Sequence, residues 1–387
     1  MKILMINKFL YPKGGSETYI LSLGKALEKL GHDVQYFGMD HPQRTLGNRV
    51  GAYVPAMDLR RGRINDALRV LYSPEARRKL RLVLEDFQPD VCHVNNFNYQ
   101  LTPSILLEIC RWRKKRGRRC PIVYTAHDYQ LVCPNHMCRS PKGNCDACVS
   151  GRVWHCARNR CIHDSRAKSI LGAVEAALWR TLGGYRNIDR IICCSAFLKE
   201  KLDYHPHLRG KTVVLPNFLP GKREKRVGAG EYVLYFGRFS PEKGLTTLLE
   251  AAKRWPQLPF VFAGSGEVIP WELPNVCNVG FRQGEELKAL IRNARFAVCP
   301  SQWYENCPFS ILESLQMGVP VLGADIGGIP ELIRPGENGD LFESGNVEAL
   351  TEKLQKLWKS PVVCDNTGLQ TAEEYAMELL EGVYGRQ

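Results

Sequence analysis

The sequence predicts an α/β protein built from two doubly wound domains, on the basis of three observations. Short apolar, β-rich runs alternate with longer helical patterns along the chain, which is typical of parallel sheets covered by helices. The 387 residues exceed the size at which one hydrophobic core keeps growing. Two prolines and a glycine within residues 216–222 interrupt the alternation and indicate a linker between the domains.

Each half of the chain contains six runs that we expect to form strands. In the first half these are residues 2–7, 34–37, 91–94, 122–125, 191–194 and 212–215. In the second half they are residues 232–236, 260–263, 276–279, 296–299, 319–322 and 340–342. In open α/β sheets ligands bind beyond the carboxyl ends of the strands, so we expect the loops of both domains to face a shared cleft.

These elements predict three parts of the chain. Residues 1–215 form an N-terminal Rossmann-like domain that carries a cysteine-rich insert at about 133–163, and residues 216–370 form a C-terminal domain. A helix is expected over 16–31, and a terminal helix over 371–387, for which packing back on the N-terminal domain is one arrangement.

The net charge of +13 is unevenly distributed. Residues 1–215 carry 36 Lys and Arg against 18 Asp and Glu, whereas residues 216–387 carry 17 against 22. The densest basic runs are residues 60–63, 77–81 and 111–119. A basic half suits an anionic membrane, a nucleic acid or an acidic substrate, and solvated helix faces are the plain alternative.

No segment has the length of a membrane span. The apolar run at residues 1–7 is too brief for a signal peptide, and no stretch approaches 18 consecutive apolar residues. We therefore expect a cytoplasmic protein, with peripheral attachment to the inner face of the membrane as a further option.

Residues 301–313 carry the main candidate site, because they follow an expected strand and open a helix. Pro308 suits the first helical position. The backbone N–H groups of Phe309 and Ser310 at this helix start suit a diphosphate. Glu313, further inside the helix, suits ribose hydroxyls, and Glu305 on the loop would face a sugar.

Two further strand-end loops carry complementary groups. Arg238 and Lys243, in residues 237–244, supply positive charge that would neutralise a diphosphate leaving group. Gly327 and Gly328 would let the backbone approach a ligand closely. An exposed ion pair between Lys243 and a carboxylate is the alternative explanation for that lysine.

Four motifs together resemble the retaining glycosyltransferases of family 4 (glycosyl transferases group 1), which have the GT-B fold of two Rossmann-like domains facing across a cleft. The motifs are the Gly14-Gly15 loop, Arg-x4-Lys-Gly, Glu-x7-Glu and Gly-Gly-x-Pro-Glu, and the likeness covers nearly the whole chain. It implies sugar transfer from a UDP- or GDP-linked donor with retention of anomeric configuration, with no cofactor or metal required for catalysis. The family's bacterial members extend polysaccharide, lipopolysaccharide or glycolipid chains, which implies a glycan or lipid-linked acceptor.

The resemblance also implies roles by position. Arg238, Lys243 and the backbone at Phe309 and Ser310 would contact the diphosphate, Glu313 the ribose and Glu305 the hydroxyls of the donor sugar. A histidine at the end of the fourth expected strand lies near the reacting centre in the family, which makes His127 and Glu305 the catalytic candidates. Gly14 and Gly15 would lie near the donor phosphates. A structural strand cap for His127, and tight turn geometry for the two glycines, are the alternatives.

The cysteine-rich insert contains six of the 15 cysteines: Cys133, Cys138, Cys145, Cys148, Cys156 and Cys161. In a reducing cytosol such clustering favours a metal over disulfides. Structural zinc needs four ligands, and Cys145 with Cys148 is a familiar half-site. Disulfides, free thiols and an iron–sulfur cluster remain open. We expect the insert to overhang the acceptor side of the cleft and to shape acceptor recognition.

Two other classes of function compete with sugar transfer. The basic half and the cysteine cluster suggest a nucleic-acid-binding protein, although no RNA-binding aromatic motif accompanies them and the three donor-site loops would have no role. We therefore expect no nucleic-acid partner. The same fold also serves nucleotide-sugar epimerases and phosphorylases, and activity without an added acceptor would favour epimerisation.

Overall fold

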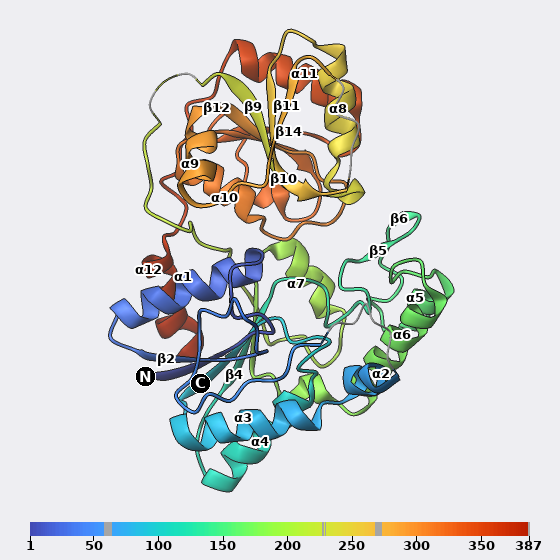
Figure 1. Ribbon diagram of the computed structural model, residues 1–387, viewed down its shortest axis with the longest axis vertical. Coiled ribbons are helices and arrows are strands. Elements are labelled where there is room, and N and C mark those ends of the chain that lie inside the picture. Colours follow the sequence, from blue (N-terminus) through green and yellow to red (C-terminus); the bar gives the residue numbers. More distant parts are fainter. Residues whose placement is uncertain (58–63, 227, 229, 268–272, 386–387) are drawn as a thin grey trace. The chain divides into compact units, whose positions relative to one another are not determined.

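The computed structural model describes residues 1–57, 64–226, 228, 230–267 and 273–385. The basic run 60–63 lies outside these residues. The chain divides into two compact units, of which unit 1 comprises Met1–Pro216 with Ala372–Gln387 and unit 2 comprises Asn217–Thr371. Each unit is an α/β layer structure around one parallel sheet, as the sequence predicts (Figure 1).

Unit 1 contains a six-stranded sheet in the order β2-β1-β3-β4-β7-β8, and every neighbouring pair of strands is parallel. Its strands are β1 (Lys2–Ile6), β2 (Asp33–Phe37), β3 (Val91–Val94), β4 (Ile122–Ala126), β7 (Arg190–Cys193) and β8 (Thr212–Val214). Its helices are α1 (Gly15–Lys29), α2 (Ile64–Leu71), α3 (Pro74–Phe87), α4 (Ser104–Arg116), α5 (Trp154–Arg158), α6 (Arg166–Thr181), α7 (Ala196–Asp203) and α12 (Ala372–Glu378), with a 3-10 turn at Gly184–Asn187 and a π-helical turn at Leu379–Tyr384.

Unit 2 contains the second six-stranded sheet, in the order β11-β10-β9-β12-β13-β14, again with parallel neighbours. Its strands are β9 (Tyr232–Phe239), β10 (Phe260–Gly266), β11 (Val276–Gly280), β12 (Ala294–Cys299), β13 (Val321–Asp325) and β14 (Gly339–Glu343). Its helices are α8 (Leu245–Arg254), α9 (Gly284–Asn293), α10 (Phe309–Gln316) and α11 (Val347–Lys359), with 3-10 turns at Pro241–Lys243 and Ile329–Glu331.

The central strands are apolar along their length because helices cover both faces of each sheet. Ile3 to Ile6 of β1 are fully buried, and Val233, Phe262 and Leu322 belong to the buried core of unit 2. The strand order changes direction beside β1 and β3 in unit 1 and beside β9 and β12 in unit 2. Loops at the carboxyl ends of these strands are therefore the places where a doubly wound sheet binds ligands.

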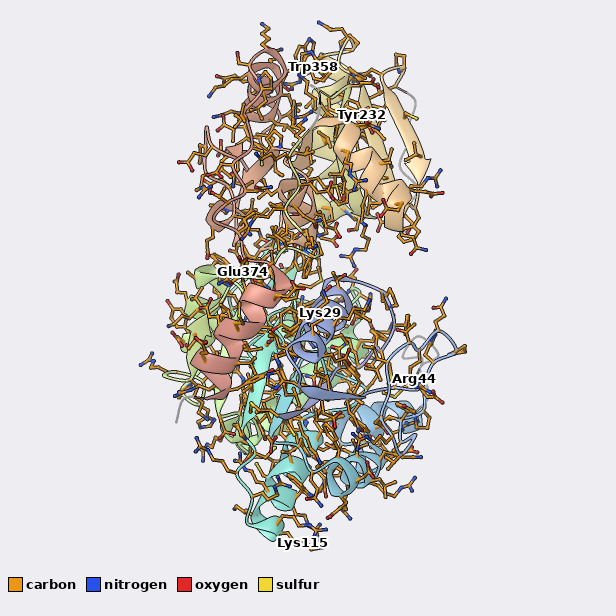
Figure 2. All side chains as sticks on the ribbon, turned by 90° about the vertical axis from the view of Figure 1, so that its left-hand side faces the viewer. Lys29, Arg44, Lys115, Tyr232, Trp358 and Glu374 are labelled. Atoms are coloured by element: carbon orange, nitrogen blue, oxygen red, sulfur yellow. The ribbon has the colours of Figure 1, made fainter. Side chains whose placement is uncertain are left out.

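The C-terminal segment completes unit 1, where α12 lies beside α1 (Figure 1). The Tyr375 hydroxyl is 2.8 Å from that of Tyr19, and the Tyr384 hydroxyl is 2.6 Å from Nδ1 of His93. Lys29 of α1 forms an exposed ion pair with Glu373 of α12 at 2.8 Å. Figure 2 labels Lys29 and Glu374, the residue next to Glu373. Buried hydroxyls and one surface ion pair thus hold this segment against α1 and β3.

Some local expectations were wrong. Pro308 is the N-cap of α10 rather than its first residue. Met377, expected on the apolar side of the terminal helix, is 45% exposed, because at about 100° per residue it lies on the opposite side of α12 from the buried Tyr375 and Leu379. The short hairpin of β5 (Arg139–Ser140) and β6 (Gly143–Asn144) in the insert had not been predicted. None of the helices that the structure describes is long and apolar enough to cross a membrane.

Candidate functional site

The end of β9 holds the predicted Arg238, and the turn that follows it, Pro241–Lys243, holds Lys243. Arg238 pairs with Glu242 one turn later, and Ser240 donates a hydrogen bond to the same carboxylate oxygen at 2.8 Å. Gly244 closes the turn at φ +73, and a Cβ there would lie 1.7 Å from the carbonyl oxygen of Pro300. Only glycine fits this position, so the loop after β9 packs directly on the start of the loop after β12.

Lys243 and Glu305 form an ion pair. Nζ of Lys243 is 2.5 Å from Oε1 of Glu305, and Ser301 donates a hydrogen bond to that oxygen at 2.7 Å. The exposed fractions of the two side chains are 23% and 8%, so this is not the exposed pair considered as an alternative. Burial alone would raise the pKa of Glu305, but Lys243 and Ser301 outweigh it and hold the pKa below its ordinary value. Glu305 is therefore a carboxylate at neutral pH.

The amino end of α10 directly follows this ion pair. No side chain caps the helix at Pro308. Ile311 donates its backbone N–H to the carbonyl of Pro308 at 3.1 Å, which leaves the N–H groups of Phe309 and Ser310 at the open end. The start of a helix carries a partial positive charge that favours anions. The two residues predicted for a diphosphate are thus the two whose N–H groups face outward.

Glu313 lies in the second turn of α10 and is half-buried. Its carboxylate has no hydrogen bond or ion pair with any residue that the structure describes. Burial raises the pKa of Glu313 to about 7, because no nearby cation compensates the lost hydration of the charged form. A half-buried carboxylate without a partner has acceptor capacity to spare for a ligand that brings hydroxyl donors.

The Gly327-Gly328 loop after β13 contacts Glu305 rather than open space. Gly327 has φ +61, and a Cβ there would lie 2.4 Å from the carbonyl oxygen of Glu305. Gly328 donates its N–H to the same carbonyl at 2.7 Å. The sequence predicts a close approach of this backbone to a ligand, whereas in the structure the backbone lies close to the loop that carries Glu305. Through this contact, the loops after β9, β12 and β13 meet around Glu305.

His127 follows β4 at the carboxyl edge of the sheet of unit 1. Its Nε2 is 2.9 Å from Oδ1 of Asn95, which follows β3, and the ring of Tyr19 stands edge-on to the imidazole at 4.9 Å. Burial lowers the pKa of His127 to about 3, so the ring is neutral at pH 7. Because Oδ1 of an amide only accepts, Nε2 carries the proton in this arrangement. His127 is thus a fixed, uncharged hydrogen-bonding group.

Gly14 and Gly15 open α1 at the same edge. Gly14 is the N-cap, with an extended φ of −167 that any residue adopts, and Gly15 is the first helical residue. A Cβ at Gly14 would touch only Oε2 of Glu17, at an ordinary 3.4 Å. The backbone at position 14 does not require a glycine. This finding weakens the alternative that tight turn geometry explains Gly14.

Two polar residues at this edge, Lys8 and Asp128, were overlooked in the sequence. Lys8, the second residue after β1, donates to the carbonyl of Asn98 at 3.0 Å, and burial lowers the pKa of its ammonium group. Asp128 follows His127, and its Oδ2 is 3.9 Å from Nδ1 of His136 in the insert. Reading the first three residues beyond every expected strand, rather than only the Gly-Gly and His motifs, would have found Lys8 and Asp128.

The metal site expected in the insert finds no support. Among the described residues, which include all six insert cysteines, no group of three or more His, Cys, Asp or Glu side chains is arranged to hold a metal ion. The Sγ of Cys133 donates to Oδ1 of Asn135 at 2.9 Å, and that of Cys148 donates to the carbonyl of Val153 at 3.6 Å. These thiols point to local polar partners, whereas tetrahedral zinc would need four of them to converge.

The arrangement in unit 2 has the parts that a nucleoside diphosphate needs. Cations and an open helix end suit the phosphates, and an unpartnered carboxylate suits ribose hydroxyls. Lys243 and Ser301 both donate to Oε1 of Glu305, so neither of these two bonds uses Oε2. The predicted donor residues lie on two loops and one helix of unit 2: Lys243 after β9, Glu305 after β12, and Phe309, Ser310 and Glu313 in α10. His127, Gly14 and Gly15 belong to unit 1.

Comparison with known proteins identifies glycosyltransferase sequences in both units. The family model "Glycosyltransferase Family 4" matches residues 13–220, and "Glycosyl transferases group 1" matches residues 222–374. An uncharacterised glycosyltransferase of Methanocaldococcus jannaschii is 28% identical over 179 residues, which cover 44% of this chain and 50% of that protein. The O-antigen chain mannosyltransferase B of Escherichia coli is 27% identical over 180 residues, 41% of this chain and 46% of that protein. The matches therefore span about half the length of these two relatives.

Among solved structures, Anabaena HepE in complex with UDP and glucose superposes with a TM-score of 0.62 at 17% identity, covering 100% of both chains. At this identity the likeness concerns the fold. Together with the two family models, which follow one another from residue 13 to residue 374, it settles the classification: the chain belongs to glycosyltransferase family 4 and has the GT-B fold.

Proposed function

We propose that the chain is a retaining hexosyltransferase that moves a sugar from a UDP- or GDP-linked donor to a glycan or lipid-linked acceptor in cell-surface polysaccharide or glycolipid synthesis. The observation that carries this proposal is the set of contacts around Glu305. A carboxylate held by Lys243 at 2.5 Å precedes an uncapped helix start, and the same helix contains the unpartnered Glu313.

Each group then has one task. Arg238, Lys243 and the N–H groups of Phe309 and Ser310 stabilise the negative charge that develops on the diphosphate as the glycosidic bond breaks. Glu313 accepts hydrogen bonds from the ribose, and Oε2 of Glu305 accepts one from a donor-sugar hydroxyl. Gly14 and Gly15 leave room beside the phosphates because they carry no side chains.

The reaction breaks the bond between the anomeric carbon and the β-phosphate oxygen. The acceptor oxygen forms its bond to the same face of that carbon, and its proton passes to the departing phosphate. This step needs neither a metal nor a protein base of its own. His127, neutral because of its low pKa, orients hydroxyl groups and does not take the proton.

The similar proteins support the substrate classes. HepE is described as bound to UDP and glucose, and the Escherichia coli relative as a mannosyltransferase of the O-antigen chain. The basic first half of the chain agrees with work at an anionic inner membrane surface, so we place the protein in the cytoplasm, peripheral to that membrane. A nucleic-acid-binding role would leave the groups around Glu305 without a task.

The test begins with thermal-shift titrations of UDP, GDP and their sugars against the whole chain, followed by transfer assays with the donor that binds. The anomeric configuration of the product is read by NMR. We expect Glu305→Gln to abolish transfer while nucleotide binding persists, and Glu352→Gln, an exposed carboxylate of α11, to change neither. An inverted product would overturn retention. Absence of binding by any nucleotide sugar, together with an inert Glu305→Gln, would overturn the proposal as a whole.

A further inference from the structure

A basic hollow of about 660 Å³ lies on the edge of unit 1 opposite to His127. It is formed by the end of α4, the loop into β4 and the start of β7, that is, by the amino ends of these strands. His127 and Ser195 follow the carboxyl ends of the same two strands. The charged residues that line the hollow are Arg113, Lys114, Arg118, Arg119, Arg190 and Asp189.

Two of these cations are already neutralised within the protein. Arg113 is 2.8 Å from Oδ2 of Asp189, and this carboxylate also accepts the backbone N–H of Ile122 at 2.7 Å. Arg118 donates to Oε1 of Gln88 at 2.8 Å and lies 3.5 Å from Asp90. These contacts hold α4 and the loop after it against the sheet, and they account for the only acidic lining residue.

The other three cations have no such partner. The side chains of Lys114, Arg119 and Arg190 make no hydrogen bond or ion pair with any residue in the part of the chain that the structure describes. Lys114 and Arg119 are exposed, and Arg190 is half-buried. Like charges that share one concave surface repel each other, and the surrounding low-dielectric wall concentrates their field. The hollow is therefore a place of strong positive potential.

Stabilisation of the helix explains only part of this arrangement. Cations in the last turn of a helix interact favourably with its carbonyl end, and Arg113 to Arg116 of α4 occupy that turn. Arg119, however, lies beyond the C-cap at Gly117, and Arg190 belongs to β7. These two residues come from segments about 70 positions apart, and no helix end needs them. What they share is the hollow.

We propose that this hollow binds a phosphate-bearing ligand, with Lys114, Arg119 and Arg190 as its contacts. A planar guanidinium presents paired N–H donors that match phosphate oxygens, and an ammonium adds a mobile point charge. The phosphate group is either the headgroup of an anionic lipid or part of a soluble polyphosphate. Lys115 is exposed at the same helix end, where Figure 2 places it on the tip of unit 1, and would add charge toward a surface. The site is independent of the sugar-transfer proposal.

The test compares two charge-reversed forms of the whole chain. Lys114→Glu with Arg119→Glu alters two exposed residues of the hollow, and Lys253→Glu with Lys359→Glu alters two exposed residues of unit 2, so that the change in net charge is equal. Both are measured by cosedimentation with vesicles of phosphatidylcholine alone or mixed with phosphatidylglycerol. In parallel, inorganic pyrophosphate is titrated calorimetrically in a Lys243→Met background, which removes the main cation of the other phosphate site.

We expect the hollow variant to lose at least about tenfold in affinity for one of the two probes, with the unit 2 variant unchanged, and the affinity to fall with ionic strength. Loss confined to the mixed vesicles identifies a lipid headgroup, and loss of pyrophosphate binding identifies a soluble ligand. If the two variants bind both probes alike, whether as tightly as the unaltered chain or equally weakly, the proposal is wrong.

Discussion

Gly327 lies against the backbone of Glu305, so that a Cβ on Gly327 would come within 2.4 Å of the Glu305 carbonyl oxygen. The Glu305 side chain is held from the other direction by Lys243 and Ser301. The position of this carboxylate is thus set by a loop on each side. A change in either loop should therefore lower the rate of sugar transfer.

Gly327→Ala should displace the Glu305 loop. The left-handed backbone costs about 1 kcal/mol for alanine, and the clash adds to it. Gly336→Ala is the matched control, because Gly336 has φ +83 and a Cβ there would meet nothing within 4 Å. We expect both variants to unfold at lower denaturant concentration, but only Gly327→Ala to lose at least about tenfold in kcat. Equal activity of the two variants would show that the contact does not position Glu305.

Removing one partner of the Lys243–Glu305 pair should destabilise unit 2. Lys243→Met leaves a buried carboxylate without its cation, at a cost of about 3 kcal/mol. The double variant Lys243→Met/Glu305→Gln should recover most of that loss in urea unfolding, while sugar transfer stays abolished in both. Additive losses of stability in the double variant would mean that the two side chains are not coupled.

Glu313 should make stability depend on pH. Its folded-state pKa of about 7 lies above the ordinary value near 4.5, so the folded chain resists ionisation that the unfolded chain undergoes freely. Stability is therefore lost as pH rises from about 4.5 to 7, by about 3 kcal/mol. Glu313→Gln should remove this loss, and should stabilise the protein at pH 8 but not at pH 4.

Donor binding should show the opposite trend at the same carboxylate. The ionised form accepts ribose hydrogen bonds better than the protonated form, so affinity for the nucleotide should rise between about pH 6 and pH 8. Calorimetric titration at both pH values checks this, with Glu313→Gln expected to bind weakly and without the pH dependence. If Glu313→Gln kept the same pH dependence of nucleotide affinity, that dependence would belong to another titrating group.

His127 should act without titrating. Because its pKa is held near 3 by burial, the transfer rate should show no inflection from this residue between about pH 5 and pH 8. His127→Ala should lower kcat by about a hundredfold with little change in the KM of the donor. Asn95→Ala, which removes the hydrogen bond between Asn95 and the ring, should lower kcat less. An inflection near pH 6.5 that disappears in His127→Ala would contradict this assignment.

Chelation should leave the protein intact. The six insert cysteines do not converge on a metal-binding group in the described residues, and the proposed reaction uses no metal. Dialysis against EDTA is therefore expected to change neither the melting temperature nor the transfer rate, and metal analysis should find no stoichiometric zinc. A fall in melting temperature that only added zinc reverses would contradict this prediction and support a zinc site in the insert.

The central strands of both sheets could be predicted from the sequence because they are buried on both faces. Such strands are continuous apolar runs, and each expected run coincides with a strand of the structure to within a few residues. The β5–β6 hairpin has two residues in each strand, too few for any periodicity to be visible. Boundaries at proline were less certain, since Pro308 is tolerated both as an N-cap and as the first helical residue.

The site was predictable in its residues but not in its contacts. Arg238, Lys243, Glu305 and Glu313 were chosen for their charge and spacing. The structure places Arg238 in β9, Lys243 and Glu305 on the loops after β9 and β12, and Glu313 in α10. That Gly327 packs on Glu305, or that Lys243 pairs with it, depends on how β9, β12 and β13 lie side by side, which spacing along the chain does not reveal. Lys8 was overlooked because a single lysine normally indicates exposed surface, whereas here it is largely withdrawn from solvent.

The chain leaves unit 1 at Pro216, passes through all of unit 2 and returns at Ala372, and the entry and exit of unit 2 pair where Leu219 bridges Thr371. During synthesis, the ribosome must therefore complete unit 2 before it supplies Tyr375 and Tyr384, whose hydroxyls fill the polar centre of unit 1 beside Tyr19 and His93. The unit that is begun first is finished last, and nascent chains that stall before residue 372 carry a complete second unit on an unfinished first one.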